Sequence, residues 1–362
     1  MFSENDKISK RQLQRLLTLE LFGMTTLLLP GLLSKRAGID GLAALVVGML
    51  FVAIFAILMC SLIKMADGDV FEYIKKCFGK TGSDFVTLWF LIQTVMLGSF
   101  ALCLCGDLIH SVLLTNIDTK WIIISFWLVC TYGASKGIEC RGRMSEVIFW
   151  PFLLPFVIVL IVAARGIHVE YLTSVLANNK MNLLEGGYEV LVIFQGLLLN
   201  LFTLPYLDDK KSAPGCIRQS ILWNCFFCAC LFLIVVGVFG ANTAAAQKWP
   251  VIVLMTTTGI FGGFIRRLDV FMIAIWIFAL FFLLSGSIFY GQKLTERLFE
   301  VKKSKKIDIG VAVLILLGAL AVGSKSIAYY VYKNYMFYIG IPVVVVIFIL
   351  LLIIGKVKIW KN

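Results

Sequence analysis

Few residues of this 362-residue chain could carry chemistry inside an apolar environment. Glu20 is the one acidic residue within the long apolar runs, and Asp107 and His110 lie near the outer end of the third run. An ionisable residue inside a membrane is a candidate functional site, because burying its charge is costly. A second interpretation places Glu20 near the cytoplasmic end of its run, where water or a neutral partner reaches it. Both interpretations fit the sequence, and we take Glu20 as a candidate gating or coupling residue.

Signals of catalysis and of metal binding are weak. The chain has two histidines, His110 and His168, which are too few for a histidine metal cluster. Cys225 and Cys228 have the spacing of a redox or metal motif, but no histidine or acidic residue lies near them in the sequence. Walker, G-x-S-x-G and H-E-x-x-H patterns are missing from the sequence. We therefore expect no enzymatic activity, no cofactor and no metal site.

The composition indicates a membrane protein. Hydrophobic residues make up 60% of the chain and charged residues 15%, whereas a soluble domain has about 45–50% and about 25%. This excludes a lone soluble domain and a disordered chain, and it makes the lipid bilayer the surroundings we expect. The net charge of +12 fits basic residues that flank spans on the cytoplasmic side. No sustained basic face is present, so we expect no nucleic-acid partner.

Ten apolar runs are long enough, or nearly so, to cross a bilayer. They cover residues 16–33, 41–63, 85–106, 121–135, 147–164, 190–207, 219–247, 270–292, 309–324 and 335–355. With both termini cytoplasmic, the cytoplasmic segments hold 23 of the 33 Lys and Arg residues, as the positive-inside rule requires. Counting 249–265 as a span would place the six basic residues of 293–306 outside, so we predict an external re-entrant or surface helix there.

We therefore predict an all-α polytopic membrane protein, with residues 1–362 forming a single membrane domain. Its ten transmembrane helices would form a 5+5 inverted repeat, the first repeat about 8–166 and the second about 184–356. The first run contains Gly23 and Pro30, and the sixth contains Gly196 and Pro205. Gly and Pro in a span free backbone polar groups, and two such breaks at matching positions point to a substrate site at the midplane. The alternative is that each glycine is a helix-packing contact.

Unwound first and sixth spans would suit a zwitterionic ligand. Free N–H groups at the positive end of a half-helix hold a carboxylate, and freed carbonyls hold an ammonium group. An amino acid fits this pattern, while sugars and nucleobases stay open as alternatives. The expected ligand-binding residues lie at the breaks or offer hydroxyls and amides nearby: Gly23, Met24, Thr25, Thr26, Thr94, Ser99, Gln195, Gly196, Leu197 and Asn200.

Two charged clusters are candidates for gating or coupling. Glu139, Arg143 and Glu146 precede the fifth run, and the spacing of three places Arg143 and Glu146 on one helical face. The cluster is either a loop-anchoring ion pair or a latch that couples the inner gate to a partner subunit. Arg267 and Asp269 either cap the eighth span or form an outer gate.

Several short motifs together carry a family resemblance over almost the whole chain. They are Ile8-Ser9-x-x-Gln12, Gly23 with Leu28-Leu29-Pro30, Gly137-Ile138-Glu139, Arg143-x-Ser145-Glu146 with Pro151, Leu204-Pro205-Tyr206, Trp249-Pro250, and Arg267-Leu268-Asp269 with Trp276. In these motifs the chain resembles the spore-germination B-subunit family (GerAB/ArcD/ProY type) of the amino acid–polyamine–organocation superfamily.

The resemblance implies a leucine-transporter-like fold with unwound first and sixth spans. It implies a germinant receptor subunit in the spore inner membrane that binds a small germinant, mainly an amino acid, and works beside an A subunit and a lipoprotein C subunit. A secondary amino acid permease and a structural scaffold are the alternatives.

The chain also departs from the family pattern. Leu197 and Leu198 follow Gly196, where the family often has an aromatic residue and a Glu, which suggests an apolar pocket wall. Ser285 and Ser287 could contribute to a sodium site, although hydroxyls in membrane helices more often bond backbone.

Overall fold

The computed structural model describes residues 6–66, 69–172, 180–257, 268–301, 305–322 and 325–359. Within these ranges the regular structure is helical, and a single parallel bridge joins Ile8 to Leu207. Each of the ten predicted runs lies largely on helix. The helices that carry nine of them are α1 (Lys10–Ala37), α2 (Gly41–Met65), α3 (Val70–Val112), α4 (Thr119–Ser135), α5 (Gly137–Ala163), α7 (Ala213–Phe239), α10 (Leu268–Leu298), α11 (Lys305–Val322) and α13 (Ile341–Ile359). The sixth run begins at the end of α6 (Lys180–Ile193) and lies mostly on 3₁₀ helix.

Seven continuous helical stretches of the described chain have the length and composition to cross a membrane, and the first of them, Lys10–Met65, contains both α1 and α2. Shorter elements connect or extend the spans. They are α8 (Ala241–Ala246), α9 (Pro250–Thr257), α12 (Lys325–Tyr335) and the 3₁₀ helices η1 (Gly38–Asp40), η2 (Ala164–Gly166), η3 (Val169–Leu172) and η6 (Lys210–Ser212).

Local sequence signals set the helix ends. Ser9 begins α1 in a capping box, in which its hydroxyl accepts from Gln12 N at 3.3 Å and Gln12 Oε1 accepts from Ser9 N at 3.1 Å. The Asp69 carboxylate caps α3 by accepting from Phe71 N at 2.9 Å. Gly79, at φ 77°, separates the short first part of α3 from its long part, and this backbone conformation favours glycine.

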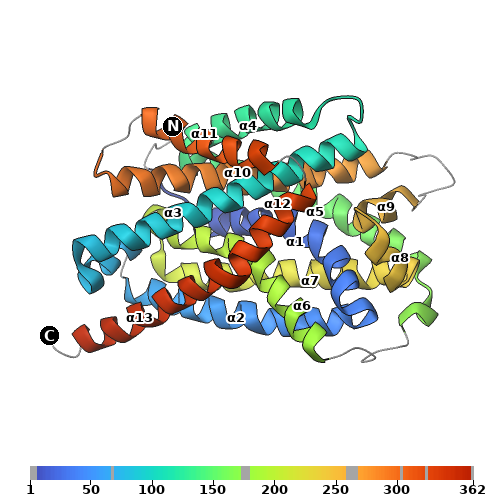
Figure 1. Ribbon diagram of the computed structural model, residues 1–362, viewed down its shortest axis with the longest axis horizontal. Coiled ribbons are helices and arrows are strands. Elements are labelled where there is room, and N and C mark those ends of the chain that lie inside the picture. Colours follow the sequence, from blue (N-terminus) through green and yellow to red (C-terminus); the bar gives the residue numbers. More distant parts are fainter. Residues whose placement is uncertain are drawn as a thin grey trace.

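Helix α1 lies at the centre of the bundle. It packs against α5, α6, α7 and α10, and residues 16–30 are all buried. Figure 1 places α2 and α4 at opposite edges of the bundle with α1 between them. Any group on α1 is therefore held by several other spans at once.

The predicted break in the first span is wrong, because α1 is one helix through Gly23 and Pro30. The glycine serves packing instead: a Cβ at position 23 would lie 3.1 Å from the backbone nitrogen of Leu280 and 3.2 Å from the Ala279 Cβ on α10. Pro30 is accommodated within this helix, and the Ser34 hydroxyl bonds back to the Pro30 carbonyl at 2.8 Å.

The sixth span does change its geometry. Helix α6 ends at Ile193 and continues as the 3₁₀ helix η4 (Phe194–Phe202), followed by η5 (Leu204–Tyr206). The last span is also irregular, since a π-helical turn, η8 (Met336–Gly340), joins α12 to α13. Such turns occur often at functional sites.

The predicted external helix at 249–265 is described in part. Helix α9 packs on α1, α7 and α10, and Pro250 lies against Gly31, where a Cβ would come within 3.1 Å of Pro250 Cγ. Trp249 Nε1 donates to Ser111 Oγ at 3.0 Å. Residues 258–265 lie outside the described residues, and the external placement, like the inverted repeat, stays a prediction.

Candidate functional site

A buried ion pair joins three spans. Arg141 Nη2 on α5 donates to Glu20 Oε1 on α1 at 2.6 Å, and both residues are 1% exposed. The same Nη2 donates to the Phe282 carbonyl on α10 at 3.0 Å, and Arg141 Nε donates to Ser285 Oγ at 3.3 Å. A buried charge is tolerated only with such partners, so the pair fixes α1, α5 and α10 relative to one another.

A glycine and a tyrosine of α10 complete this site. A Cβ at Gly286 would lie 2.6 Å from Arg141 Nη2 and 2.8 Å from Glu20 Oε1, so only glycine lets α10 approach the pair this closely. The Arg141 guanidinium carbon lies 5.5 Å from the centroid of the Tyr290 ring. Among the described residues, Glu20 Oε2, Arg141 Nη1 and the Tyr290 hydroxyl have no hydrogen-bond partner.

The sequence does not predict Arg141 as a site residue, because Arg141 lies between the uncharged runs 121–135 and 147–164, in a segment that the topology assigns to a cytoplasmic loop. Helix α5 in fact begins at Gly137, ten residues before the uncharged run that starts at 147. Two sequence signals point to it. A charged Glu20 inside a span requires a partner of opposite charge, and Arg141 lies four residues before Ser145, on the same helical face. The structure buries both Arg141 and Ser145.

A second polar cluster lies where the sixth span changes from α to 3₁₀. A cavity of about 10 Å³, which we call the amide cavity, lies here. It is lined by Phe90, Gln93, Thr94 and Leu97 of α3 and by Gln195, Leu198, Leu199 and Phe202 of η4. Gln195 Nε2 lies 3.5 Å from Gln93 Oε1. Gln93 Nε2, Gln195 Oε1 and, nearby in η4, Asn200 Oδ1 lack partners among the described residues. Unsatisfied buried amides are rare in folded proteins, and here they offer donor and acceptor atoms beside a cavity.

The π-helical turn η8 borders this cluster. A Cβ at Gly340 would lie 3.0 Å from Gln93 Nε2. The Tyr188 hydroxyl of α6 donates to the Phe337 carbonyl in the same turn at 3.1 Å. Irregular backbone of the sixth and last spans therefore approaches α3 at this cluster.

A vestibule of about 300 Å³ lies next to the amide cavity. Its lining includes Asp69, Phe71, Phe202, Pro205, Tyr206, Tyr290, Lys293, Leu294, Glu296 and Arg297. Phe202 borders both spaces and separates them together with the rings of Phe71, Phe90 and Tyr290, whose centroids lie 5.6, 5.7 and 6.1 Å from that of Phe202. Tyr290 also lines the vestibule, and its ring lies between this space and the Arg141 guanidinium, which it contacts.

An ion pair closes the rim of the vestibule. Arg297 of α10 binds the Asp69 carboxylate through both terminal nitrogens, and its guanidinium carbon lies 4.5 Å from the centroid of Phe71. Burial acts to raise the pKa of Asp69, but the hydrogen bonds and charge of Arg297 and the backbone N–H groups of Phe71 and Glu72 outweigh it. The pKa of Asp69 is therefore held below its ordinary value.

Comparison with known proteins identifies the family. A family model described as "Spore germination protein" matches residues 7–327. The chain belongs to the spore germination protein family. The predicted resemblance is thereby confirmed at the level of the family.

Relatives in this family match most of the chain. Spore germination protein B2 of Bacillus subtilis (strain 168) is 23% identical over 325 residues, which cover 87% of this chain and 86% of that protein. Spore germination protein A2 of the same organism is 24% identical over 304 residues, covering 81% of each chain.

A solved structure extends the comparison to the fold. The chain is similar to a protein described as the "Substrate-bound outward-open state of a Na+-coupled sialic acid symporter", with a TM-score of 0.56 at 12% identity over 90% of this chain and 75% of that one. This confirms the leucine-transporter-like, multi-span membrane fold.

The ten predicted ligand-binding residues of this spore germination protein separate into several environments. Thr94 and Gln195 line the amide cavity. Gly196 packs toward Leu21 and Leu283, while Met24 and Leu197 are core residues. Gly23 faces α10 as described above, and the buried Asn200 carries an unpartnered Oδ1.

The three predicted hydroxyl residues outside the amide cavity bond backbone. The hydroxyls of Thr25 and Thr26 donate to the carbonyls of Leu21 and Phe22 at 2.9 and 2.6 Å. Thr26 Oγ1 also accepts from Trp276 Nε1 at 3.0 Å. Ser99 donates to the Ile315 carbonyl at 3.1 Å, beside a separate cavity of about 110 Å³. The ligand-binding role of all ten residues stays a prediction.

The predicted charged cluster on α5 is divided. Arg143 pairs with Glu139 one turn away, whereas Glu146 Oε2 accepts from Gln12 Nε2 at 3.1 Å and Glu146 Oε1 from Arg11 Nε at 2.6 Å. Arg143 and Glu146 therefore have separate partners, on α5 and on the N-terminal turn of α1, and the gating or coupling role of the cluster stays a prediction. Arg267 and the side chain of Asp269 lie outside the described residues.

Ser285 and Ser287, predicted as possible sodium ligands, bond the backbone of α10. Their hydroxyls donate to the carbonyls of Phe282 and Leu283 at 3.2 and 3.0 Å. Ser285 Oγ also accepts from Arg141, so a fixed positive charge occupies its other side.

Proposed function

We propose that this chain is a spore germinant receptor subunit that binds a small, amino-acid-like ligand at the amide cavity between α3 and η4. The observation that carries the proposal is a pair of unpartnered amide atoms, Gln93 Nε2 and Gln195 Oε1. The two residues are 3% and 2% exposed. Family membership and the names of its spore germination relatives support the biological setting. The transporter fold supports a ligand site among the spans.

The chemistry of the cavity suits a zwitterion. An amide N–H donates to a carboxylate, and an amide oxygen accepts from an ammonium group. The eight described residues that line the cavity include no charged side chain, and Phe90, Leu97, Leu198 and Leu199 form an apolar wall. A net neutral ligand with a small apolar side chain meets both requirements. Because α1 is continuous, side chains and η4 would bind the ligand, and the ends of two half-helices would not.

Ligand binding would require the spans to move. A volume of about 10 Å³ is near the space one water needs, so an amino acid fits only if η4 moves away from α3. A ligand that binds the widened state better shifts the equilibrium toward it. We infer that this shift is the germination signal.

A chain of contacts leads from η4 to the end of the bundle that we predict to be cytoplasmic. At the end of η5, Ile8 N donates to the Tyr206 carbonyl at 2.8 Å, and just after η5 Asp208 N donates to the Ile8 carbonyl at 3.2 Å. Ile8 precedes the α1 cap, whose Gln12 and Arg11 hold Glu146 of α5. Movement of η4 would therefore displace this surface. We propose that the A and C subunits sense it there, in the spore inner membrane.

Deletion of the gene, followed by a panel of germinants scored by loss of spore refractility, tests the proposal. We expect one response to disappear, to return with the wild-type gene, and to stay absent with Gln195→Leu expressed at the wild-type level. Gln219→Leu, the same substitution at an exposed position of α7 outside the amide cavity, is the matched control and should restore it. Full response with Gln195→Leu would contradict the site, and an unchanged panel after deletion would contradict the receptor role.

A secondary amino acid permease is the second candidate, and the symporter-like fold favours it. Counterflow of labelled amino acid into proteoliposomes separates the two, because a receptor that only signals shows binding without uptake. Uptake that exceeds empty liposomes would assign flux to this chain.

A further inference from the structure

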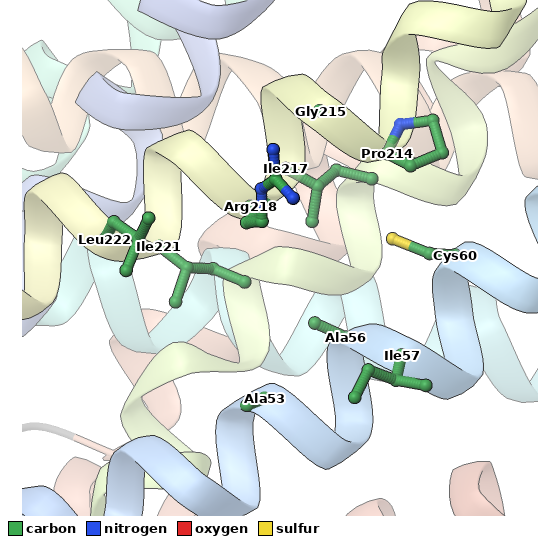
Figure 2. Close-up of a pocket in the computed structure, with 10 residues that line it drawn as sticks. All are labelled: Ala53, Ala56, Ile57, Cys60, Pro214, Gly215, Ile217, Arg218, Ile221 and Leu222. Carbon is green, nitrogen blue, oxygen red and sulfur yellow. The ribbon is translucent and has the colours of Figure 1, made fainter.

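A groove on the outer surface of the bundle lies between α2 and α7. It encloses about 430 Å³ and is lined by Ala53, Ala56, Ile57 and Cys60 of α2 and by Pro214, Gly215, Ile217, Arg218, Ile221 and Leu222 of α7. Figure 2 shows the side chains of the two helices facing each other across it. This volume lies within the roughly 300–1,000 Å³ of pockets that hold small molecules. The groove shares no lining residue with the amide cavity.

The groove opens toward the lipid. Leu50, Ile54 and Ile57 on α2 are 60%, 58% and 65% exposed, and Leu222 and Phe226 on α7 are 61% and 57% exposed. In a membrane protein such apolar side chains contact acyl chains. An occupant that enters from the bilayer therefore passes apolar side chains on both helices.

The charged residue of the groove, Arg218, lies in the second turn of α7. Arg218 is the one charged residue among the ten that line it, and it is exposed and has no ion pair with the described residues. Lys64 lies in the last turn of α2, and Lys210 and Lys211 precede α7. All four cations lie at the helix ends that the positive-inside bias assigns to the cytoplasm.

We propose that this groove binds an anionic phospholipid, with one acyl chain between α2 and α7 and the phosphate at Arg218. An apolar channel with small side chains accepts an alkyl chain, and a guanidinium binds phosphate through paired N–H donors. Basic pockets between membrane helices on the cytoplasmic side recognise anionic headgroups in this way. A helix of a partner subunit would leave Arg218 facing an apolar surface, so the charge favours lipid.

Binding of short-chain phosphatidylglycerol to the purified full-length chain in detergent, measured by native mass spectrometry against short-chain phosphatidylcholine, tests the proposal. We expect about tenfold tighter binding of phosphatidylglycerol, and loss of this preference in Arg218→Gln. Gly215→Leu should weaken binding of both lipids, because nothing lies within 4 Å of a Cβ at Gly215 and the new side chain would fill the groove.

Matched controls keep the test specific. Gly310 also has open space around its Cβ position, so Gly310→Leu should leave lipid binding unchanged, as should Lys356→Gln at the end of α13. Equal binding of the two lipids by the wild type would overturn the headgroup site, and normal binding by Gly215→Leu would overturn the groove. If the variants instead lose a co-expressed partner subunit while lipid binding is unchanged, the occupant is protein and the proposal fails.

Discussion

Arg141 Nη2 lies 2.6 Å from Glu20 Oε1, although 121 positions separate the two residues in the chain. The contact joins α5 to α1, and the Phe282 carbonyl and the Ser285 hydroxyl tie the same guanidinium to α10. Glu20, the one acid in the apolar runs, is therefore part of a clamp among three spans and is not a solvated end residue.

Breaking the clamp should destabilise the protein. Glu20→Leu or Arg141→Leu leaves an uncompensated buried charge, so each should lower the free energy of unfolding by about 3–5 kcal/mol. The double variant should lose less than the sum of the two. Unfolding in detergent, followed by circular dichroism, measures this cycle. Additive losses would show that the two groups do not depend on each other.

Gly286→Ala should disturb the same clamp without removing a charge. The added Cβ would lie 2.6 Å from Arg141 Nη2, and overpacking of this kind costs about 1–3 kcal/mol. Gly310→Ala, where the Cβ meets nothing within 4 Å, is the matched control. A difference in melting temperature between the two variants is expected, and identical melting temperatures would argue against close packing at Gly286.

Phe202 should control exit from the amide cavity toward the vestibule. Phe202→Leu removes the ring contacts with Phe71, Phe90 and Tyr290, and we expect release of bound ligand to accelerate about tenfold, which corresponds to about 1.4 kcal/mol. Dilution of a complex with labelled ligand measures the half-life. Phe299→Leu, at an exposed position, should leave the half-life unchanged.

The rim pair predicts a specific pH dependence. The pKa of Asp69 in the folded state lies below its ordinary value, which is about 3.9 in an unfolded chain. The ion pair with Arg297 therefore stabilises fully above that ordinary value, and its contribution is lost as the pH falls through the lowered folded value. Wild type should melt above Asp69→Asn at pH 7, and the gap should narrow below about pH 4. A gap that widens in acid would contradict the assignment.

Ligand binding should not depend on sodium. The Ser285 hydroxyl accepts from Arg141 and donates to its own helix, and a permanently charged guanidinium opposes a cation beside it. Affinity measured in sodium chloride and in choline chloride at equal ionic strength should agree. A clear loss of affinity without sodium would require a cation site elsewhere.

The apolar runs predicted the spans well. A membrane helix must pair its own backbone N–H and C=O groups and cross the hydrocarbon layer, so its length and apolar composition are visible in the sequence. Interactions between distant helices were harder to predict. Gly23 and Gly196 look alike in sequence, yet α1 stays helical through Gly23 because Leu280 packs against it, while the 3₁₀ geometry that contains Gly196 begins at Phe194. Both glycines pack against other spans, so residue type alone does not distinguish a packing glycine from a break.

The candidate site shows the same division. The sequence pointed to Thr94 and Gln195 by residue type, and the structure brings them to one cavity. Gln93, next to Thr94, was not singled out, because it lies inside an uninterrupted apolar run, whereas Gln195 stands beside Gly196 at the predicted break. The π-helical turn of the last span also had no sequence signal, although it approaches the same amide.

Equilibrium binding of labelled amino acids to the purified protein tests the central claim most directly. We predict that one or a few small, apolar amino acids bind the wild type and Gln219→Leu alike, and that Gln93→Leu and Gln195→Leu each weaken binding at least tenfold while melting near the wild-type temperature. Failure of the whole standard set to bind the wild type, or unchanged affinity in both glutamine variants, would contradict it.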